Sequence, residues 1–126
     1  HPITHLQPAA QGSELSEFQR QVWDVYVDQS LEDYILKLVL ATRNAPDLAL
    51  GASPRASLAL YKTSQALAAL RGRDHVLPDD VKYLAPFTIA HRLIVRPEAE
   101  LRGKNTTTIL KDLLETVPLE LGKPPG

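Results

Sequence analysis

Apolar residues recur at steps of three and four along most of the chain, with polar residues between them. This spacing is typical of amphipathic helices, whereas no segment alternates strictly enough to predict a half-buried strand. Serine, threonine and proline residues, which favour the first helical turn, mark where each helix begins. We expect helices to begin at Ser13, Ser30, Pro54, Pro78, Pro86 and Thr106. The pattern therefore predicts an all-α fold, a small bundle of about five to six helices without a convincing sheet.

The helical spacing also assigns the residues that face the core. In the first three helices these positions are Leu15, Phe18, Val22 and Val25, then Leu31, Ile35, Leu38 and Thr42, then Ala56, Leu60, Thr63, Leu67 and Leu70. The third helix, predicted over 54–71, is the longest, and its many alanines allow a neighbouring helix to approach closely. We therefore expect it at the centre of the bundle, with Gly72 as a left-handed cap at its end.

Prolines and polar stretches divide the chain into segments. Residues 1–12 hold two prolines and no helical period, so we expect a linker or surface arm there. Pro86 should end one helix and start the next, and residues 98–105 should form a polar loop. Pro118 should stop the last helix, predicted over 106–115, and leave residues 118–126 as a frayed tail. One domain, residues 13–117, lies between the arm and the tail.

Composition narrows the functional classes. A chain of 126 residues that is 44% hydrophobic and 23% charged suits one globular domain with its own core. Nucleic-acid-binding modules neutralise phosphates with an excess of basic residues, whereas this chain has a net charge of −1, so we expect no nucleic acid partner. There is no cysteine, no membrane-spanning apolar run of about 20 residues and no signal peptide, which favours a cytoplasmic location. Because the chain begins at His1 and contains no methionine, we expect it to be a piece of a longer protein.

Motifs for autonomous catalysis are missing from the sequence. No phosphate loop, nucleophile elbow or H-E-x-x-H zinc motif occurs, so this piece alone is not expected to be an enzyme. The histidines fall in different segments, without the i, i+4 spacing of a helical metal site, and no metal site is predicted. They are His1, His5, His75 and His91. Asp79 and Asp80 are interpreted as first-turn residues favoured by the helix dipole, rather than as paired catalytic carboxylates.

The stretch GASPRA at 51–56 raises a question of charge placement. Ser53 and Pro54 indicate a helix start, because a serine hydroxyl accepts a free backbone N–H and proline suits the first helical position. Arg55 then lies in the first turn, where the helix dipole disfavours a cation by about 0.3–1 kcal/mol. A solvated or locally paired arginine is one interpretation. The other is an external phosphate bound jointly by backbone N–H groups and the guanidinium.

Five motifs in a fixed order resemble the helical lid of the MoxR family of AAA+ ATPases. They are ATR at 41–43, GASPRA at 51–56, LRGRD at 70–74, PDDV at 78–81 and HRL at 91–93, within a resemblance over residues 15–117. In that family the arginine that matches Arg55 is the second sensor, which reaches the γ-phosphate of ATP in the core. The resemblance implies that this phosphate is the anion, and that Ser53 and Pro54 belong to the same nucleotide-facing helix start. At about 4 Å and an effective dielectric constant of about 20, the charge pair gains about 4 kcal/mol before desolvation, more than the dipole cost.

The resemblance also implies a larger assembly. ATP and Mg²⁺ would be bound mainly by an ATPase core that this sequence lacks, so ATP hydrolysis belongs to the parent chain and the fragment alone needs no cofactor. Lids of this family work with their own core and with neighbouring subunits of a ring, usually a hexamer. The family often acts with von Willebrand factor A domain proteins in chaperone-like maturation of client complexes. Leu77 departs from the family pattern, which often has threonine or serine there, and the lost cap costs about 1 kcal/mol.

Secondary candidates and other functions complete the expectations. Four further arginines could contact the core or an adjacent subunit: Arg43, Arg71, Arg73 and Arg92. Arg73 can instead pair with Asp74 or Asp80. One alternative function is a free-standing helical module that binds a protein partner without nucleotide. Another, a helix-turn-helix DNA-binding module, is disfavoured by the net charge of −1 and by the acidic start of the fourth helix.

Overall fold

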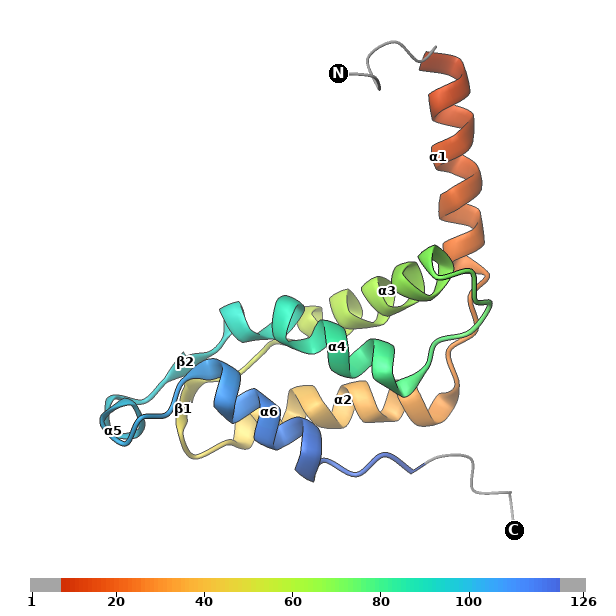
Figure 1. Cartoon of the computed structure of the whole chain (residues 1–126). Helices are drawn as coiled ribbons and strands as arrows, with labels where there is room; N and C mark the ends of the chain where they lie inside the picture. Colours follow the sequence, from red (N-terminus) through yellow and green to blue (C-terminus); the bar gives the residue numbers. More distant parts are fainter. Residues whose placement is uncertain (1–7, 121–126) are drawn as a thin grey trace.

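The computed structural model describes residues 8–120, with side chains from Glu14 onward, and its regular structure is mainly helical (Figure 1). The helices are α1 (Pro8–Trp23), α2 (Gln29–Asn44), α3 (Pro54–Leu70), α4 (Pro78–Ile89), α5 (Pro97–Leu101) and α6 (Thr106–Thr116), with a 3₁₀ turn over Ala90–Arg92. Two short strands, β1 (Leu48–Leu50) and β2 (Ile94–Val95), complete this part of the chain. The predicted all-α fold of five to six helices is confirmed over these residues.

The hydrophobic core is organised around α3, which contacts α1, α2 and α4, as its small side chains predict. On α2 every predicted inward residue is buried: Leu31, Ile35, Leu38 and Thr42. α6 packs against α2 and α4 and buries Ile109 and Leu110. The hydroxyl of Tyr34 on α2 donates a 2.8 Å hydrogen bond to the carbonyl of Leu114, which ties the end of α6 to α2.

The buried face of α3 differs from the predicted one. Its buried residues are Ala56, Leu60, Ser64, Gln65 and Ala68. The predicted inward residues Thr63 and Leu67 are only half-buried, and Leu70 is exposed. Close helix packing favours small side chains, and Gln65 is tolerated inside because its Nε2 donates to the Val25 carbonyl at 3.0 Å. The prediction was wrong here because it ranked positions by apolarity rather than by size and hydrogen bonding.

The C-terminal end of α3 is closed by Gly72, as predicted, with a φ of 73°. The Gly72 N–H donates to the Ala69 carbonyl at 3.0 Å, and the Arg73 N–H donates to the Ala68 carbonyl at 2.9 Å. This pair of bonds is the Schellman pattern, which satisfies carbonyls that the helix end leaves free. It places Arg73 directly after the helix, at the turn that leads to α4.

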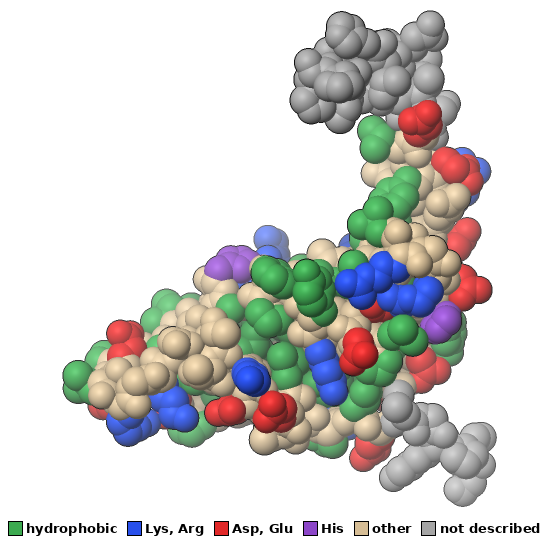
Figure 2. All heavy atoms as spheres, in the orientation of Figure 1, with side chains coloured by type: hydrophobic (Ala, Val, Ile, Leu, Met, Phe, Trp, Pro, Cys, Tyr) green, Lys and Arg blue, Asp and Glu red, His purple; other side chains and the backbone are tan. Residues whose placement is uncertain are grey.

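α1 begins at Pro8 rather than at the predicted Ser13, because proline serves as a first helical residue. Residues 1–7 of the predicted arm and residues 121–126 of the predicted tail lie outside the described residues. α1 stands away from the body of the molecule and meets it near the end of α3 (Figure 1). Leu15 and Trp23 are therefore exposed, and Val25 alone of the predicted stripe is fully buried. Figure 2 shows the hydrophobic side chains along this protruding helix.

A short two-stranded antiparallel ribbon accompanies the helices, where no convincing sheet was expected. β1 pairs with β2, so that Leu48 lies opposite Val95 and Leu50 opposite Ile94. Strands of two or three residues offer too few alternating positions to be detected from sequence. The ribbon closes the end of the bundle where the chain passes from α2 to α3 (Figure 1).

Proline positions also behave differently from expectation. α4 continues through Pro86 instead of breaking there. Val81, Ala85 and Ile89 are buried on both sides of the proline, and their packing offsets a cost of about 3 kcal/mol for the lost hydrogen bond and ring clash. α5, which begins at Pro97, lies in the segment predicted to be a polar loop.

The N-terminal cap of α2 is Asp28 rather than the predicted Ser30. The Asp28 carboxylate accepts a hydrogen bond of 3.0 Å from the Ser30 N–H, and α2 begins at Gln29. In the first turn of α2, Asp33 accepts a hydrogen bond of 3.1 Å from the Gln29 Nε2. Aspartate caps helices as well as serine does, and its charge also interacts favourably with the positive end of the helix dipole, which explains why Asp28 rather than Ser30 caps α2.

Candidate functional site

The loop that leads into α3 is fastened to the end of α2. Thr42, which is 1% exposed, donates from its Oγ1 to the Val39 carbonyl at 2.6 Å and accepts from the Ala52 N–H at 2.9 Å. A Cβ on Gly51 would lie 2.5 Å from the Cα of Arg43 and 2.6 Å from the carbonyl oxygen of Thr42. Gly51 is not among the residues with positive φ, so close backbone approach requires glycine there. These contacts fix the path of the chain just before α3.

Ser53, Pro54 and Arg55 follow this loop and start α3. Pro54 occupies the first helical turn as predicted, but the Ser53 side chain makes no capping hydrogen bond, so the predicted hydroxyl cap is wrong. The Ser57 Oγ donates to the Pro54 carbonyl at 2.6 Å. No acidic residue lies in the first turn of α3.

Arg55 is exposed at this helix start. Among the residues that the structure describes, its guanidinium takes part in no ion pair; the pairs that do form involve other residues. The interpretation in which a local carboxylate neutralises Arg55 is therefore not supported. A solvent-facing cation lies at the positive end of the helix dipole, where an anion from outside the bundle can reach it.

Arg43 lies next to the same helix start. It is exposed in the last turn of α2, where the helix dipole favours a cation. An open pocket of about 350 Å³ is lined by Arg43 together with Ala49, Leu50, Gly51, Ala52, Ser53 and Pro54. None of the described residues that line this pocket carries a carboxylate. Of the secondary arginines, the fold brings Arg43 to the segment that carries Arg55.

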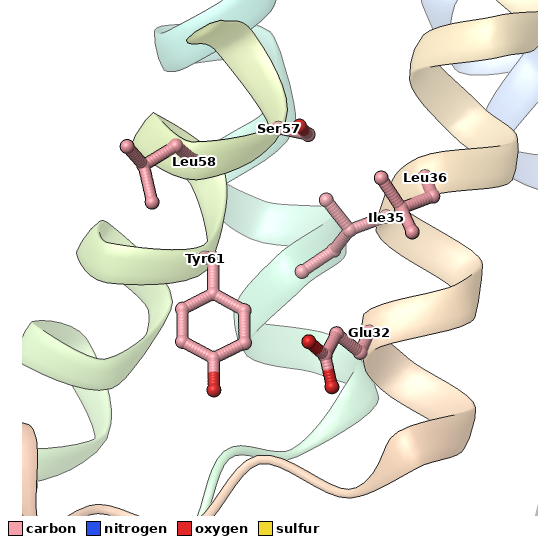
Figure 3. Close-up of a pocket in the computed structure, with 6 residues that line it drawn as sticks. All are labelled: Glu32, Ile35, Leu36, Ser57, Leu58 and Tyr61. Carbon is pink, nitrogen blue, oxygen red and sulfur yellow. The ribbon is translucent and has the colours of Figure 1, made fainter. Parts of the chain in front are cut away.

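A shallow groove of about 220 Å³ separates α2 from α3 (Figure 3). It is lined by Glu32, Ile35 and Leu36 of α2 and by Ser57, Leu58 and Tyr61 of α3. Ile35 lies between the two helices, while Leu36 and Leu58 are 50% and 55% exposed. Leu58 follows Arg55 by three residues and therefore shares its side of α3. The surface beside Arg55 is thus partly apolar.

Arg71 and Arg73 lie at the opposite end of α3 and are engaged by Asp80 of α4. Both Nη atoms of Arg73 lie 2.6 Å from a carboxylate oxygen of Asp80, and the Nη1 of Arg71 lies at 3.5 Å. The Leu77 N–H donates to the same carboxylate at 2.8 Å. Asp74, the other partner considered for Arg73, pairs with His75 at 2.9 Å. Arg73 therefore stabilises the turn between α3 and α4.

The Asp80 carboxylate is completely buried, which changes its role from the predicted one. Burial by itself raises the pKa of Asp80, but the hydrogen bonds from Arg73 and the Leu77 N–H outweigh it. The net effect, with the nearby Arg71 charge, is a pKa below the ordinary aspartate value. Leu77 offers no side-chain cap, and Asp80 bonds its N–H instead. Asp79 stays exposed in the first turn, as expected of a dipole residue.

The remaining candidates lie apart from the start of α3. The Nε of Arg92, in the 3₁₀ turn, donates to the Thr88 carbonyl at 3.1 Å, which holds this half-buried side chain against the end of α4. His75 and His91 are both exposed. Within the described residues, no cluster of three or more histidine and carboxylate side chains is arranged to hold a metal ion. In that same part of the chain, none of the helices has both the length and the hydrophobicity needed to cross a bilayer.

Two residues of the site were not singled out from sequence. Thr42 was correctly assigned to the core, but its hydroxyl bond to the loop was not foreseen. Gly51 was not interpreted at all, although its close contact with α2 makes it irreplaceable without backbone movement. The available signals were a threonine in an otherwise apolar stripe and a glycine shortly before a helix start.

Comparison with known families identifies the class of this helical bundle, an AAA lid domain. The family described as "AAA lid domain" matches residues 40–113, more than half of the chain, and the chain belongs to this family. Among curated relatives, Chaperone MoxR1 of Mycobacterium tuberculosis is 36% identical over 103 residues, covering 75% of this chain and 27% of the relative. YeaC of Bacillus subtilis is 43% identical over 117 residues, covering 93% of this chain and 37% of the relative.

A solved structure agrees with these relatives. The crystal structure described as "a putative ATPase from Cytophaga hutchinsonii" superposes with a TM-score of 0.75 at 35% identity, covering 80% of this chain and 33% of the other. The chain is accordingly a lid domain of the MoxR family of AAA+ ATPases. It spans about a third of the length of the proteins it matches.

Proposed function

We propose that this lid closes over ATP bound by the ATPase core of its parent protein, and that Arg55 contacts the terminal phosphate as a second-sensor arginine. The observation that carries the proposal is the exposed guanidinium of Arg55 in the first turn of α3, without an ion pair among the described residues. The helix dipole disfavours a cation in this position. When an anion binds at this helix start, the net electrostatic interaction of the Arg55 charge becomes favourable.

The groups at the start of α3 suit a phosphate rather than a metal ion. The Ser53 side chain makes no capping bond, so its hydroxyl does not satisfy the first-turn N–H groups. Phosphate oxygens accept hydrogen bonds from such N–H groups and from a guanidinium. Arg43, in a neighbouring pocket without carboxylates, adds a second positive charge. Mg²⁺ is usually bound by carboxylate and phosphate oxygens, and no carboxylate is among the described residues that line the pocket at the start of α3, so the core would hold the ion together with ATP.

Coupling between nucleotide and lid follows from the difference between ATP and ADP. Arg55 gains its partner when the γ-phosphate is present and loses it after hydrolysis. A ligand shifts a conformational equilibrium only by its different affinity for the two states. The γ-phosphate supplies that difference, so the lid would close in the ATP state and reopen after hydrolysis, moving the neighbouring subunit.

The surface around Arg55 is suited to burial against another part of the assembly. Leu36 and Leu58 remain about half exposed beside the groove between α2 and α3. Exposed apolar side chains next to a charged site are typical of an interaction surface. We assign this surface to the core of the parent protein or of a neighbouring ring subunit. A hexameric ring in the cytoplasm and von Willebrand factor A domain partners belong to the same proposal, on the grounds of family alone.

The proposal is tested on the full-length parent protein with Arg55→Ala. We expect steady-state ATP turnover to fall about 10²-fold, the scale for removing one donor from a developing oxyanion. Affinity for a non-hydrolysable ATP analogue should fall as well, while ADP affinity should stay unchanged because ADP has no γ-phosphate. Arg55→Lys keeps the charge without the bidentate geometry and should be intermediate.

Arg96→Ala is the matched control, because Arg96 is also an exposed arginine next to a helix start, at the N-cap of α5. It should leave turnover and nucleotide binding at the level of the unmodified protein. Unchanged turnover and analogue affinity in Arg55→Ala would show that the second-sensor role is wrong. Equal losses in both variants would indicate a general effect of surface charge instead.

A further inference from the structure

The buried hydroxyl of Thr42 connects the end of α2 to the loop that carries Arg55. It donates to the Val39 carbonyl at 2.6 Å within α2 and accepts from the Ala52 N–H at 2.9 Å across to the loop. Both Thr42 and Ala52 are 1% exposed, so water does not compete for this bond. Ala52 precedes Arg55 by three residues.

Close contacts next to this bond restrict the same segment. Gly51 lies against the backbone of α2, where even a Cβ would come within 2.6 Å of the Arg43 nitrogen. The side chain of Ser53 makes no capping bond that could locate the helix start independently. Among the described residues, the Thr42 hydroxyl is therefore a side-chain group that ties the segment before α3 to α2 by a hydrogen bond.

We propose that Thr42 is a positioning residue for Arg55: its hydroxyl, through the Ala52 N–H, holds the start of α3 in the place from which the guanidinium reaches the phosphate. This inference rests on the proposed function of Arg55. Thr42 is itself only 1% exposed, so its side chain is not available to contact a nucleotide directly. Its effect on turnover is transmitted by the position of the backbone, and Arg43, adjacent to Thr42 in sequence, is placed by the same contacts.

Two substitutions separate the hydroxyl from the shape of the side chain. Thr42→Val keeps the branched volume and removes the hydroxyl, which leaves the buried Ala52 N–H without a partner. Thr42→Ser keeps the hydroxyl and removes one methyl group. If position matters, Thr42→Val should lower ATP turnover of the full-length protein about tenfold, since a misplacement of about 1 Å can cost about 10²-fold in rate and a smaller shift costs less. Thr42→Ser should remain within about twofold of the unmodified protein, because the bond that positions the loop is preserved.

A double-mutant cycle with Arg55→Ala distinguishes positioning from general damage. If Thr42 acts through Arg55, Thr42→Val should have almost no further effect on turnover once Arg55 is alanine. Affinity for ADP should be the same in all four proteins, whereas affinity for a non-hydrolysable ATP analogue should fall in both single variants. Val81→Ala, a buried substitution in α4 away from this loop, serves as the control for lost stability and should leave turnover unchanged.

The outcomes separate the two proposals. The positioning role would be overturned if Thr42→Val lowered turnover by the same factor in the unmodified protein and in Arg55→Ala. It would also be overturned if Thr42→Val had normal turnover while Arg55→Ala was impaired. A loss in Thr42→Val that Val81→Ala reproduces would equally overturn it. Normal turnover in Arg55→Ala would overturn the second-sensor function itself.

Discussion

Replacing the buried Asp80 by asparagine is predicted to weaken the domain through a single carboxylate. The side chain keeps its size, but the negative charge between α3 and α4 is removed. Arg73 then loses its ionic partner at 2.6 Å, and Arg71 loses the same carboxylate at 3.5 Å. The hydrogen bond from the Leu77 N–H, 2.8 Å long, can still be accepted by the amide oxygen.

The magnitude follows from burial. The Asp80 side chain is 1% exposed, whereas that of Arg73 is 21% exposed and can recover part of its hydration. Breaking a buried ion pair from one side costs about 3–5 kcal/mol, and partial exposure of the cation places this case near the lower limit. We therefore expect Asp80→Asn to lower the free energy of unfolding by about 3 kcal/mol. For a domain of this size the melting temperature should fall by about 12 °C.

Urea unfolding at neutral pH and at acid pH measures this effect. Because the folded-state pKa of Asp80 is lowered below the ordinary 3.8, its ionised form stabilises the fold above that pH. The contribution is lost as the pH falls through the folded-state pKa, where the protonated carboxyl resembles the amide. The difference between the unmodified domain and Asp80→Asn should therefore be largest at neutral pH and shrink below pH 3.8.

Asp79→Asn provides the matched control, since Asp79 is the same residue type in the same helical turn but is exposed. It should lose only the interaction with the helix dipole, about 0.3–1 kcal/mol. The reasoning is refuted if both variants lose the same stability at neutral pH. It is also refuted if the deficit of Asp80→Asn does not depend on pH.

Two further substitutions test the backbone. Gly51→Ala should destabilise the domain by about 1–3 kcal/mol in urea unfolding, because the new Cβ meets the α2 backbone at 2.5 Å; an unchanged midpoint would mean that the loop can move away at little cost. Pro86→Ala should instead raise the free energy of unfolding by about 1–2 kcal/mol, and the melting temperature with it, because proline cannot donate the backbone hydrogen bond at this position inside α4. A lower melting temperature in Pro86→Ala would indicate that the proline shapes the helix in a way the core requires.

The helices could be predicted from sequence because their apolar spacing is regular and their starts carry recognisable residues. α2 is the clearest case, since the spacing of Leu31, Ile35 and Leu38 identified its buried face correctly. α6 was predicted within one residue of its observed end. In α2 the apolar residues at the helical spacing are buried, whereas Leu36 and Leu40, outside that spacing, are exposed, so the spacing of apolar residues and the packing agree.

The failures have a common physical cause, which is that burial depends on neighbours. Leu15 has helical spacing but stays exposed, because α1 projects from the body and nothing described covers that part of it. Ser64 is polar and buried, because it faces a close helix contact in which small size matters more than apolarity. Pro86 does not break α4, because buried residues on both sides hold the helix together.

The candidate site was also only partly predictable from sequence. The first-turn position of Arg55 follows from Pro54 and from the amphipathic pattern after it, and the structure places it there. The expected cap by Ser53 was wrong, because side-chain capping depends on rotamer and loop path, which local sequence does not determine. The bond between Thr42 and Ala52 joins residues ten apart and appears only after α2 and the loop are folded against each other.

The two polar contacts at the ends of α3 have a joint consequence for movement. At its start the Thr42 hydroxyl and the tight contact of Gly51 hold α3 to α2, and at its end the Asp80 carboxylate holds it to α4. Between these ends α3 buries a closely packed face that includes three small residues, Ala56, Ser64 and Ala68, which leaves little room for sliding. A force applied to Arg55 would therefore be transmitted to α2, α3 and α4 together rather than bending α3 alone. If Arg55 responds to the γ-phosphate as proposed, the response should be a rigid-body movement of the bundle. Distances between α2 and α4 should then stay constant in ATP and ADP states, while the distance from α3 to the core changes.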